Sequence, residues 1–468
     1  MLTYSLEDRG TDSLYEYIYK CIKNDILKGH IKPDEKLPSK RAFARQHDIS
    51  VITVENAYGQ LQAEGYIYSK AKSGFYVSKI EKDMYISAKK DIKKAYKQAD
   101  CEVMPAYYAS FTAGSAGNEN FPFSIWTRLL RETLSEDSGV TMRKSPAWGV
   151  PELRNEIADY LRQFRGMDID PNRIVIGAGT EYLYGLIIQL LGRDKCYAME
   201  EPGYLKISHI YEANDVKEVH IPLDEKGIDM EKLKHSDADV VHISPSHHFP
   251  TGIITPVSRR YELMSWVASG ADRYIIEDDY DSEFRMQGRP IPTLWSMDMQ
   301  DRTIYINTFS KSLSSTIRIS YMVLPERLMS KFKQELGFYS CTVSNFDQYT
   351  LAKFIGRGYF EKHINRMRNH YKSIRDTMLS AIRDRRDYDR VTISEEDAGL
   401  HFLMEVETAY TDSQLIRSAA DHGIEVSALS QYYNDSRLAK EHTLLINYAG
   451  ISADKIYEAV DRLFDSFD

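Results

Sequence analysis

The segment Asn307–Pro325, NTFSKSLSSTIRISYMVLP, places one lysine, Lys311, among serines and between two apolar runs. TIYIN precedes the lysine, and ISYMVL follows it. Short runs rich in β-branched and aromatic residues are typical of buried strands. A solvated lysine needs no such setting. A lysine that forms an imine with an aldehyde does, because its amine must be held near the aldehyde and be partly desolvated to be nucleophilic. The segment therefore predicts a reactive lysine at the end of a strand.

Six short runs share the apolar, β-branched character of a buried strand. They are Asn172–Gly179, Lys195–Glu201, Lys217–Leu223, Ala238–Pro245, Asp272–Asp279 and Arg302–Ser312. Helical patterns separate them, which implies a mostly parallel sheet with helices on both faces. After about residue 350, the runs His401–Glu407 and His442–Ala449 alternate with helices. We therefore expect an α/β domain over 109–468 with a smaller C-terminal α+β subdomain over about 350–468.

Two polar residues stand at the carboxyl end of the fifth run. Asp278 and Tyr280 are two residues apart, so in an extended chain both side chains point to one side. A carboxylate there can keep a pyridine nitrogen protonated, which makes the ring an electron sink. A phenol there can bond the phenolic oxygen of the same ring.

A turn of small residues is suited to binding an anion. The stretch IGAGTEYLYG, residues 176–185, places Gly177, Gly179 and Thr180 where a strand passes into a helix. The free N–H groups at the start of that helix can bind a phosphate. Other candidates supply charge, hydroxyl donors and an aromatic face for stacking. They are Arg318, Thr308, Ser310 and Tyr204.

Composition limits the class of protein. The chain has 468 residues, 43% hydrophobic and 28% charged, which allows more than one domain and excludes a fibrous or disordered protein. Four cysteines lie far apart without a CxxC pair, which suits a reducing cytosol and indicates no metal site. The N-terminus lacks a secretion signal pattern, and no apolar run is long enough to span a membrane. A cytoplasmic protein with no membrane partner is expected.

Charge is distributed unevenly along the chain. The formal net charge is −9, yet residues 1–79 hold 12 Lys and Arg against 10 Asp and Glu. The segment KLPSKRAFAR, Lys36–Arg45, contains four basic residues and no acidic one. We call residues 1–79 the head and the rest of the chain the body. An acidic body with a locally basic head is expected when the head binds nucleic acid. A solvated helix face would give the same charges, so charge alone does not decide.

Residues 1–79 have the pattern of helices followed by a wing. Apolar residues recur at helical spacing over 13–29, and Gly29 favours a helix end. Ser39 and Ser50 are expected N-caps of two further short helices, which is a helix-turn-helix pattern. YIYS and GFYVS, residues 66–69 and 74–78, then alternate as two strands.

This segment resembles the winged helix-turn-helix of GntR-type regulators, because LPSKRAFA, VITVENAYGQLQAEGYI and SGFYV occur in that order. The resemblance implies that residues 50–56 enter the major groove of double-stranded DNA and that the wing lies near the minor groove or the backbone. The residues so implied are Ser39, Lys40, Arg41, Ser50, Thr53, Asn56 and Lys72. The family usually has arginine directly after its VS dipeptide, where this chain has Val51. Base readout there is expected to differ.

The remainder of the chain resembles the aminotransferase-type, fold-type-I family of pyridoxal-phosphate proteins. TFSKSLSSTIRISYMVLP matches the family's imine-lysine segment. EDDYDSEFR, SPSHHFPTG, AWGVPELRNEIADYL and FPFSIW are the forms seen when such a domain follows a GntR-type head. The combination resembles the MocR family of transcriptional regulators. It implies a DNA-binding domain over 1–79, a linker over 80–108 and a cofactor-binding domain over 109–468.

The resemblance implies pyridoxal 5'-phosphate as the cofactor and gives each candidate a role. Lys311 would form the internal aldimine, Asp278 would partner the ring nitrogen, Tyr280 would bond the phenolic oxygen, and Tyr204 would stack on the ring. The residues expected around the phosphate are Gly179, Thr180, Thr308, Ser310 and Arg318. His247 and Pro250 would lie beside the ring edge.

Other positions bear on whether the site catalyses transamination. A working aminotransferase normally holds the substrate carboxylate with an arginine of the small subdomain. Leu444 and Leu445 stand where such enzymes commonly place it, and Lys206 stands where GABA-responsive family members have arginine. Arg437 lies nearby in sequence and is a candidate substitute. These differences argue against efficient transamination and against GABA as the effector.

The sequence thus favours a regulator that senses pyridoxal phosphate itself, as PdxR-type members do when they control synthesis of that cofactor. Three alternatives stay open. One is an active aminotransferase with an accessory DNA-binding head, and another is a regulator that responds to an amino acid as the external aldimine. The third is a DNA-binding head on a scaffold that binds no cofactor. Family members form homodimers, so a homodimer on paired half-sites is expected.

Overall fold

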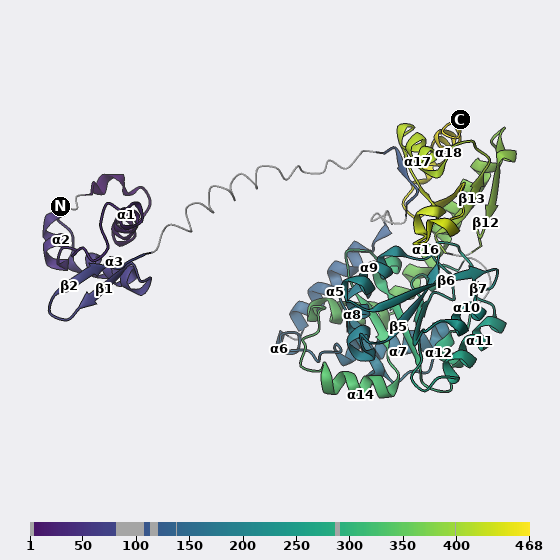
Figure 1. The fold of residues 1–468 in the computed structure, drawn as a ribbon, viewed down its shortest axis with the longest axis horizontal. Helices are drawn as coiled ribbons and strands as arrows, with labels where there is room; N and C mark the ends of the chain where they lie inside the picture. The colour runs from purple at the N-terminus through teal and green to yellow at the C-terminus, as the bar shows by residue number, and fades with distance from the viewer. Residues whose placement is uncertain (1–3, 81–106, 113–119, 137, 286–290, 398) are drawn as a thin grey trace. The chain divides into compact units, whose positions relative to one another are not determined.

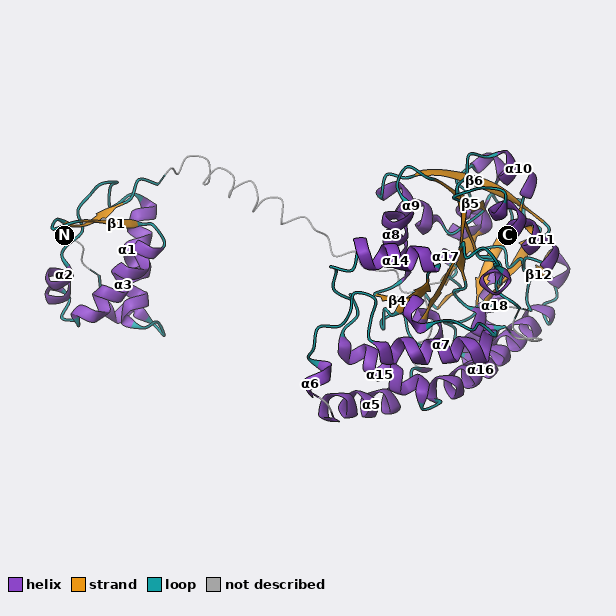
Figure 2. Cartoon of the chain, turned by 90° about the horizontal axis from the view of Figure 1, so that it is seen from below, coloured by secondary structure: helices purple, strands orange, loops and turns teal. Residues whose placement is uncertain are grey.

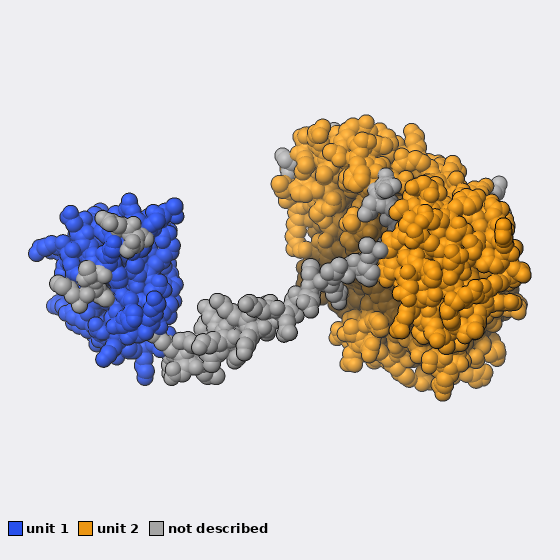
Figure 3. All heavy atoms as spheres, turned by 90° about the horizontal axis from the view of Figure 1, so that it is seen from above, with its two compact units in different colours: residues 1–104 blue, residues 105–468 orange. Residues whose placement is uncertain are grey.

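The computed structural model describes residues 4–80, 107–112, 120–136, 138–285, 291–397 and 399–468 (Figure 1). The chain divides into two compact units, residues 1–104 and 105–468, which are coloured separately in Figure 3. The linker expected over 80–108 lies outside the described residues, apart from positions 80, 107 and 108.

The first unit combines helices with a β-hairpin. Its elements are η1 (Leu6–Arg9), α1 (Leu14–Lys28), α2 (Lys40–Gln46), α3 (Val51–Ala63), β1 (Ile67–Lys70) and β2 (Gly74–Val77). β1 and β2 pair antiparallel, with Ile67 opposite Val77. Gly29 follows α1 with φ of 82°, a left-handed conformation that glycine adopts without strain.

Both expected N-caps are confirmed. Ser39 Oγ accepts a hydrogen bond from the Ala42 N–H at 3.2 Å, and Ser50 Oγ accepts one from the Thr53 N–H at 3.1 Å. Each such cap typically contributes about 1 kcal/mol. One side of α3 faces the interior, because Val54 and Leu61 are fully buried in one core with residues of α1. The caps and this core together fix which side of α3 faces solvent.

The described part of the second unit contains an eight-stranded sheet in the order β4-β11-β10-β9-β8-β5-β6-β7. The strands are β4 (Ile174–Gly177), β5 (Cys196–Glu201), β6 (Lys217–Asp224), β7 (Gly227–Ile228), β8 (Val240–Ile243), β9 (Tyr274–Asp278), β10 (Thr303–Thr308) and β11 (Ser320–Val323). β5, β6, β8, β9 and β10 pair in parallel, whereas β11 is antiparallel to both of its neighbours and β7 to β6. The expected α/β fold with a mostly parallel sheet is confirmed.

Helices cover both faces of this sheet because its central strands are apolar on both sides. On β10, Ile304 and Ile306 pack in one core with α8 (Thr180–Leu191), α9 (Leu205–Ala213) and α14 (Glu326–Glu335). Tyr305 points the other way and packs in a core with α7 (Pro151–Arg165), α15 (Asn345–Gly356) and α16 (Tyr359–Arg383). Figure 2 shows these last three helices running together along one side of the unit. Successive side chains thus alternate between two cores, as a strand requires.

The other described helices of the second unit that precede its C-terminal part are short or flank this framework. They are α5 (Phe123–Glu136), α6 (Ser138–Thr141), η4 (Pro171–Arg173), α10 (Met230–His235), α11 (Val257–Ala268), η5 (Ser282–Phe284), α12 (Leu294–Met297) and α13 (Phe309–Ser312). α13 matters most here, since it carries Lys311 and begins directly after β10.

The C-terminal part forms a smaller α+β layer, as expected. Its four-stranded sheet has the order β12-β13-β16-β15, with β12 (Val391–Ser394), β13 (His401–Val406), β15 (Ser427–Ala428) and β16 (Thr443–Asn447). Around it lie η6 (Tyr388–Arg390), α17 (Asp412–Asp421), η7 (Leu429–Tyr432), η8 (Ser436–Leu438), η9 (Ala453–Lys455) and α18 (Ile456–Phe464). A separate parallel pair joins β14 (Ile424–Glu425) to β3 (Ala109–Ser110). None of the described helices is long and apolar enough to cross a membrane.

Candidate functional site

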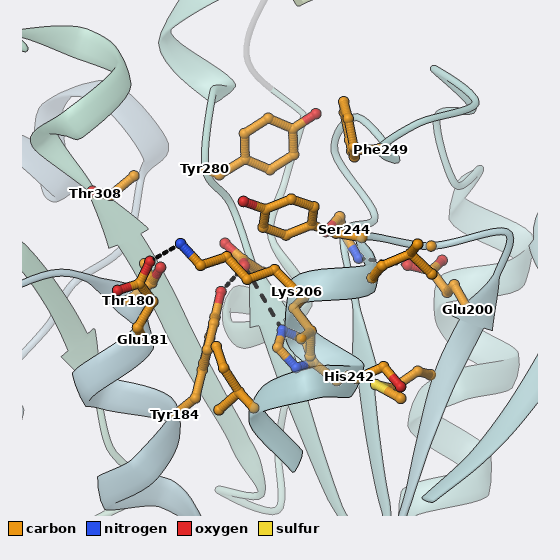
Figure 4. A pocket seen from close by; sticks show the side chains of 18 of the residues that line it. Thr180, Glu181, Tyr184, Glu200, Lys206, His242, Ser244, Phe249, Tyr280 and Thr308 are labelled. Atoms are coloured by element: carbon orange, nitrogen blue, oxygen red, sulfur yellow. Dashed lines mark hydrogen bonds and ion pairs between the residues drawn. The ribbon is translucent and has the colours of Figure 1, made fainter. Parts of the chain in front are cut away.

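One pocket of about 450 Å³ opens at the carboxyl edge of the large sheet. In open α/β sheets this edge is where ligands bind, because the loops after neighbouring parallel strands meet there. Eight of the residues expected to hold the cofactor line the pocket: Thr180, Tyr204, Asp278, Tyr280, Thr308, Ser310, Lys311 and Arg318. Figure 4 shows part of this lining. Residues more than a hundred positions apart in sequence are therefore brought together.

Lys311 lies in the single turn of α13 and lines the pocket. Burial lowers the pKa of its amine, and the nearby carboxylate of Asp281 opposes that shift. A lowered pKa leaves a larger share of the amine neutral, which is the nucleophilic form. The surroundings thus suit a lysine that reacts with a carbonyl group.

Asp278, at the end of β9, has two side-chain neighbours that sequence reasoning missed, of which Tyr184 is hydrogen-bonded to it. The Tyr184 hydroxyl donates a hydrogen bond to Asp278 Oδ2, and His242 Nε2 lies 3.7 Å from the same oxygen. Tyr184 belongs to α8 and His242 to β8, and both are labelled among the pocket side chains in Figure 4. His242 is itself bonded through Nδ1 to the Tyr211 hydroxyl at 2.7 Å. The other carboxylate oxygen, Oδ1, is buried and has no hydrogen-bond partner among the described residues.

The unpartnered Asp278 Oδ1 shows whether the pocket fits a pyridine cofactor, because such a ring can supply the missing hydrogen-bond donor. A buried acceptor without a partner costs free energy, roughly 1–3 kcal/mol or more for a charged group. A protonated ring nitrogen would satisfy it. Together with Lys311 in the same pocket, the donor set fits pyridoxal phosphate.

Tyr280 stands beside this pair, two residues beyond Asp278. Its hydroxyl lies 3.2 Å from His247 Nδ1. Burial, together with the charges of Asp281 and Asp278, raises the pKa of Tyr280 well above its usual range. The phenol therefore stays protonated and can donate a hydrogen bond into the pocket.

His247 does not line the main pocket. Its Nδ1 lies 2.8 Å from Asp281 Oδ2, and its ring lines a separate cavity of about 20 Å³ beside Gly399. The neighbouring His248 and Phe249 line the main pocket instead. Adjacent side chains on this bend point to different cavities, which is why the sequence alone did not separate the two histidines. The contact of His247 with Tyr280 links it to the main pocket.

The opposite end of the pocket is built from the start of α8 and from two other segments. Gly179 caps α8 with φ of 97°, and an added Cβ would lie 2.3 Å from Arg318 Nη2. The guanidinium therefore rests against the backbone of the turn. The Thr308 hydroxyl accepts hydrogen bonds from the Ser310 N–H at 3.1 Å and from the Ser320 hydroxyl at 2.8 Å. Backbone N–H groups, an arginine and hydroxyls at a helix start suit a phosphate.

Tyr204 and the small subdomain form the outer part of the site. The Tyr204 side chain is 48% exposed, and its ring meets that of Phe249 edge-on at 5.6 Å. Leu444 and Leu445 are buried in β16. Arg437 is 86% exposed and pairs with Asp435 at 2.8 Å. Among the described lining residues, Asn434 is the only one beyond position 350, so the small subdomain supplies no arginine there.

The expected DNA-contacting residues lie on the solvent side of the head. Arg41, Asn56 and Lys72 are exposed, and Lys72 lies in the turn between β1 and β2 with φ of 59°. The hydroxyls of Ser39 and Ser50 are engaged as caps, and Thr53 Oγ1 lies 2.8 Å from Ser50 Oγ. Lys40 Nζ pairs with Glu55 Oε1 at 2.6 Å.

Apolar residues also reach the solvent side of the head. Val51 is 42% exposed and Ile52 69% exposed in the first turn of α3. Their exposure at the start of α3 is not explained by the packing of the head.

Comparison with known proteins identifies both parts of the chain. Residues 14–77 match the family of bacterial regulatory proteins of the gntR type, and residues 116–463 match aminotransferase class I and II. A rhizopine catabolism regulatory protein of Rhizobium meliloti, named MocR and described as probable, is 31% identical over 98% of this chain and 95% of its own length. The chain belongs to the MocR family of transcriptional regulators.

Two further regulators and one solved enzyme structure are also similar to this chain. An uncharacterized HTH-type transcriptional regulator of Bacillus subtilis, YdeL, is 37% identical over 96% of both chains. The pyridoxine biosynthesis transcriptional regulator PdxR of Corynebacterium glutamicum is 28% identical over 92% of this chain and 91% of its own. A kynurenine aminotransferase of Pyrococcus horikoshii, solved in complex with PMP, shares the fold with a TM-score of 0.67 at 23% identity, covering 86% of this chain and 96% of its own. MocR-family membership makes this chain a DNA-binding regulator with an aminotransferase-like domain.

The structure provides no evidence for a metal centre in its described part. No group of three or more His, Cys, Asp or Glu side chains gathers there in a way that could hold a metal ion.

Proposed function

We propose that this regulator senses pyridoxal phosphate in the pocket lined by Lys311 and alters its affinity for double-stranded DNA in response. The observation that carries the proposal is the pairing, in one pocket, of an amine of lowered pKa with the orphaned buried oxygen Asp278 Oδ1. The 28% identity to a pyridoxine biosynthesis regulator supports genes of cofactor synthesis as targets.

Each pocket residue contributes a distinct part of the binding. When bound, the cofactor supplies an aldehyde that reacts with an amine and a pyridine ring that draws electrons. Lys311 offers the amine, and Asp278 holds a proton at the ring nitrogen. Tyr280 donates to the ring oxygen, while Arg318 and the start of α8 neutralise the phosphate. The Tyr184 hydroxyl orients the Asp278 carboxylate by its hydrogen bond, and His242 lies 3.7 Å from the same carboxylate oxygen.

The outer part of the pocket favours a sensor over a transaminase. An amino-acid substrate needs a cation for its carboxylate. Arg437 points to solvent, and Lys206 is already paired with Glu181. A sensor needs only a ligand that binds two conformational states with different affinity. We propose further that the protein acts as a homodimer, whose two heads match paired half-sites on the operator.

The decisive experiment measures operator binding by wild type and Lys311→Ala, each with and without pyridoxal phosphate. Duplexes selected by the protein from a random-sequence library serve as the operator. The ligand is expected to shift the DNA Kd of wild type and to leave that of Lys311→Ala unchanged. Lys232→Ala, at an exposed lysine of α10, is the matched control and should respond as wild type does. Equal DNA binding in all four wild-type and Lys311→Ala cases would refute the proposal.

An aminotransferase with an accessory DNA-binding head is the second candidate. It is favoured by the match of residues 116–463 to aminotransferases and by the retained Lys311 and Asp278. It predicts keto-acid formation from an amino acid over many turnovers. An absorption spectrum taken before and after borohydride separates both candidates from a protein that binds no cofactor.

A further inference from the structure

Three charged side chains form a chain of ion pairs at the phosphate end of the pocket. Glu181 lies in the first turn of α8, directly after Thr180. One of its carboxylate oxygens pairs with Lys206 Nζ, and the other lies 3.1 Å from Arg318 Nη2. Figure 4 shows the amine of Lys206 directed at Glu181 beside Thr180. All three side chains line the pocket and are about half exposed.

The carboxylate of Glu181 stands where it competes with a bound phosphate. The start of a helix attracts negative charge because its free N–H groups carry partial positive charge. The carboxylate of Glu181, in the first turn of α8, already satisfies part of that attraction. Arg318 is the cation expected to hold the phosphate, yet it is already engaged by Glu181. The two anions must share Arg318 or exchange at it, and their charges repel each other.

The position of Arg318 limits how the competition can be relieved. Its guanidinium lies so close to Gly179 that no side chain would fit between it and the turn. Arg318 therefore lies directly beside the phosphate site. Lys206 comes from a different helix, α9, and offers Glu181 a second cation. The carboxylate can therefore leave Arg318 without losing its charge partner.

We infer that Glu181 is an internal competitor for the phosphate of the ligand, which keeps binding weak enough to be reversible, and that Lys206 holds the carboxylate when the phosphate takes Arg318. This inference rests on the proposed function and concerns its regulation. A sensor is useful only when its affinity lies near the working concentration of its ligand, since a saturated site reports nothing. An enzyme that keeps its cofactor permanently would have no use for such a competitor.

The test compares ligand affinity of the full-length Glu181→Gln and Lys206→Gln variants, both made in the Lys311→Ala background. That background removes the covalent bond, so only non-covalent affinity is measured. Glu181→Gln is expected to lower the Kd for pyridoxal phosphate about fivefold at low salt, the scale of a partly exposed charge interaction. Lys206→Gln should raise it, because Glu181 then depends on Arg318 alone. Both effects should shrink at 1 M salt, which screens charges.

Controls separate this inference from a structural role and from the proposed function. Glu212→Gln, an exposed position on α9, should leave the Kd unchanged. Glu181→Ala should act in the same direction as Glu181→Gln, which guards against a variant that fails to fold. Unchanged or weaker binding by both Glu181 variants overturns the inference while the proposed function stands. Failure of every variant and of wild type to bind pyridoxal phosphate overturns the proposed function, and the inference with it.

Discussion

Asp278 and Lys311 reach one pocket from the ends of neighbouring parallel strands. Asp278 ends β9 and is in register with Ile306 of β10, and Lys311 follows the end of β10 by three residues. The pairing of β9 with β10 therefore sets the separation of the carboxylate and the amine. Changes at either residue are expected to affect ligand binding without disturbing the sheet.

Asp278→Asn should weaken pyridoxal-phosphate binding at least tenfold. The substitution keeps the size of the side chain but removes the charge that holds a proton at the ring nitrogen, and charged hydrogen bonds contribute about 1.5–3 kcal/mol. Titration followed by the absorbance of the bound ligand gives the Kd. Asp272→Asn is the matched control, since Asp272 precedes the same strand and pairs with Lys195 at the surface. Equal affinity of Asp278→Asn and wild type would contradict the role proposed for this carboxylate.

Gly179→Ala should destabilise the protein and impair ligand binding together. A Cβ at this position would meet Arg318 Nη2 at 2.3 Å, and φ of 97° is unfavourable for alanine. Strain of this kind costs about 1–3 kcal/mol. Gly185→Ala offers a control within the same helix, because nothing lies within 4 Å of its added Cβ. The control should gain roughly 0.5–1 kcal/mol, since glycine weakens a helix interior. Thermal unfolding distinguishes the two, and a stable Gly179→Ala with normal ligand affinity would argue against the tight turn.

Local features of the fold were predictable from the sequence because they depend on neighbours along the chain. Ser39 and Ser50 cap helices through residues three positions away, and Gly29 ends α1 in the conformation that its lack of a side chain permits. The strand that ends at Asp278 follows from an apolar run and a polar end. Such patterns needed no knowledge of the tertiary structure.

The missed residues depend on contacts between distant elements. Tyr184 and Asp278 are 94 positions apart and come from a helix and a strand on different parts of the chain. His242 gave one usable signal, a single histidine within the continuous apolar strand β8, but nothing along the chain indicated which strand lay next to it. Likewise, the pairing of Glu181 with Lys206 and Arg318 arises only when three segments meet. His247 and His248 are adjacent, and only the bend in the structure shows which one enters the main pocket.

The stability of Glu200→Gln relative to wild type should rise with pH. Burial raises the pKa of Glu200 to about 8, the charge of Asp278 adds to the shift, and the Ser244 N–H opposes it. The folded pKa exceeds the ordinary value of 4.5 that applies to the unfolded chain, so between these values the folded chain holds a proton that the unfolded chain has lost. Wild-type stability from this group therefore falls as pH rises through that window. Glutamine does not ionise and removes the fall.

Unfolding midpoints of both proteins at pH 5.5 and pH 8.5 check this expectation. Glu212→Gln, an exposed substitution, should show no such dependence. His248, which lies 3.4 Å from Glu200, is neutral in the folded protein because burial lowers its pKa to about 3. Its protonation in the unfolded chain is common to both proteins and cancels in their difference. A difference between Glu200→Gln and wild type that is the same at both pH values would show that Glu200 keeps its charge in the folded protein.

Ile52→Ala should weaken DNA binding at sites that contain thymine under the start of α3. Ile52 and Val51 expose apolar surface at the position where the GntR-type head is expected to enter the major groove. The C5-methyl group of thymine is the apolar feature of that groove, and burying one methyl-sized group contributes about 0.8 kcal/mol. The expected loss is therefore about fourfold in Kd on a duplex selected by the wild-type protein.

Replacing the thymines of that duplex with deoxyuridine removes only their methyl groups, so wild type should lose the same factor while Ile52→Ala loses little more. Gln60→Ala, exposed farther along α3, should bind both duplexes as wild type does. If Ile52→Ala and wild type lose equal affinity on the deoxyuridine duplex, the methyl groups are read by another residue, and Ile52 contributes to binding in some other way.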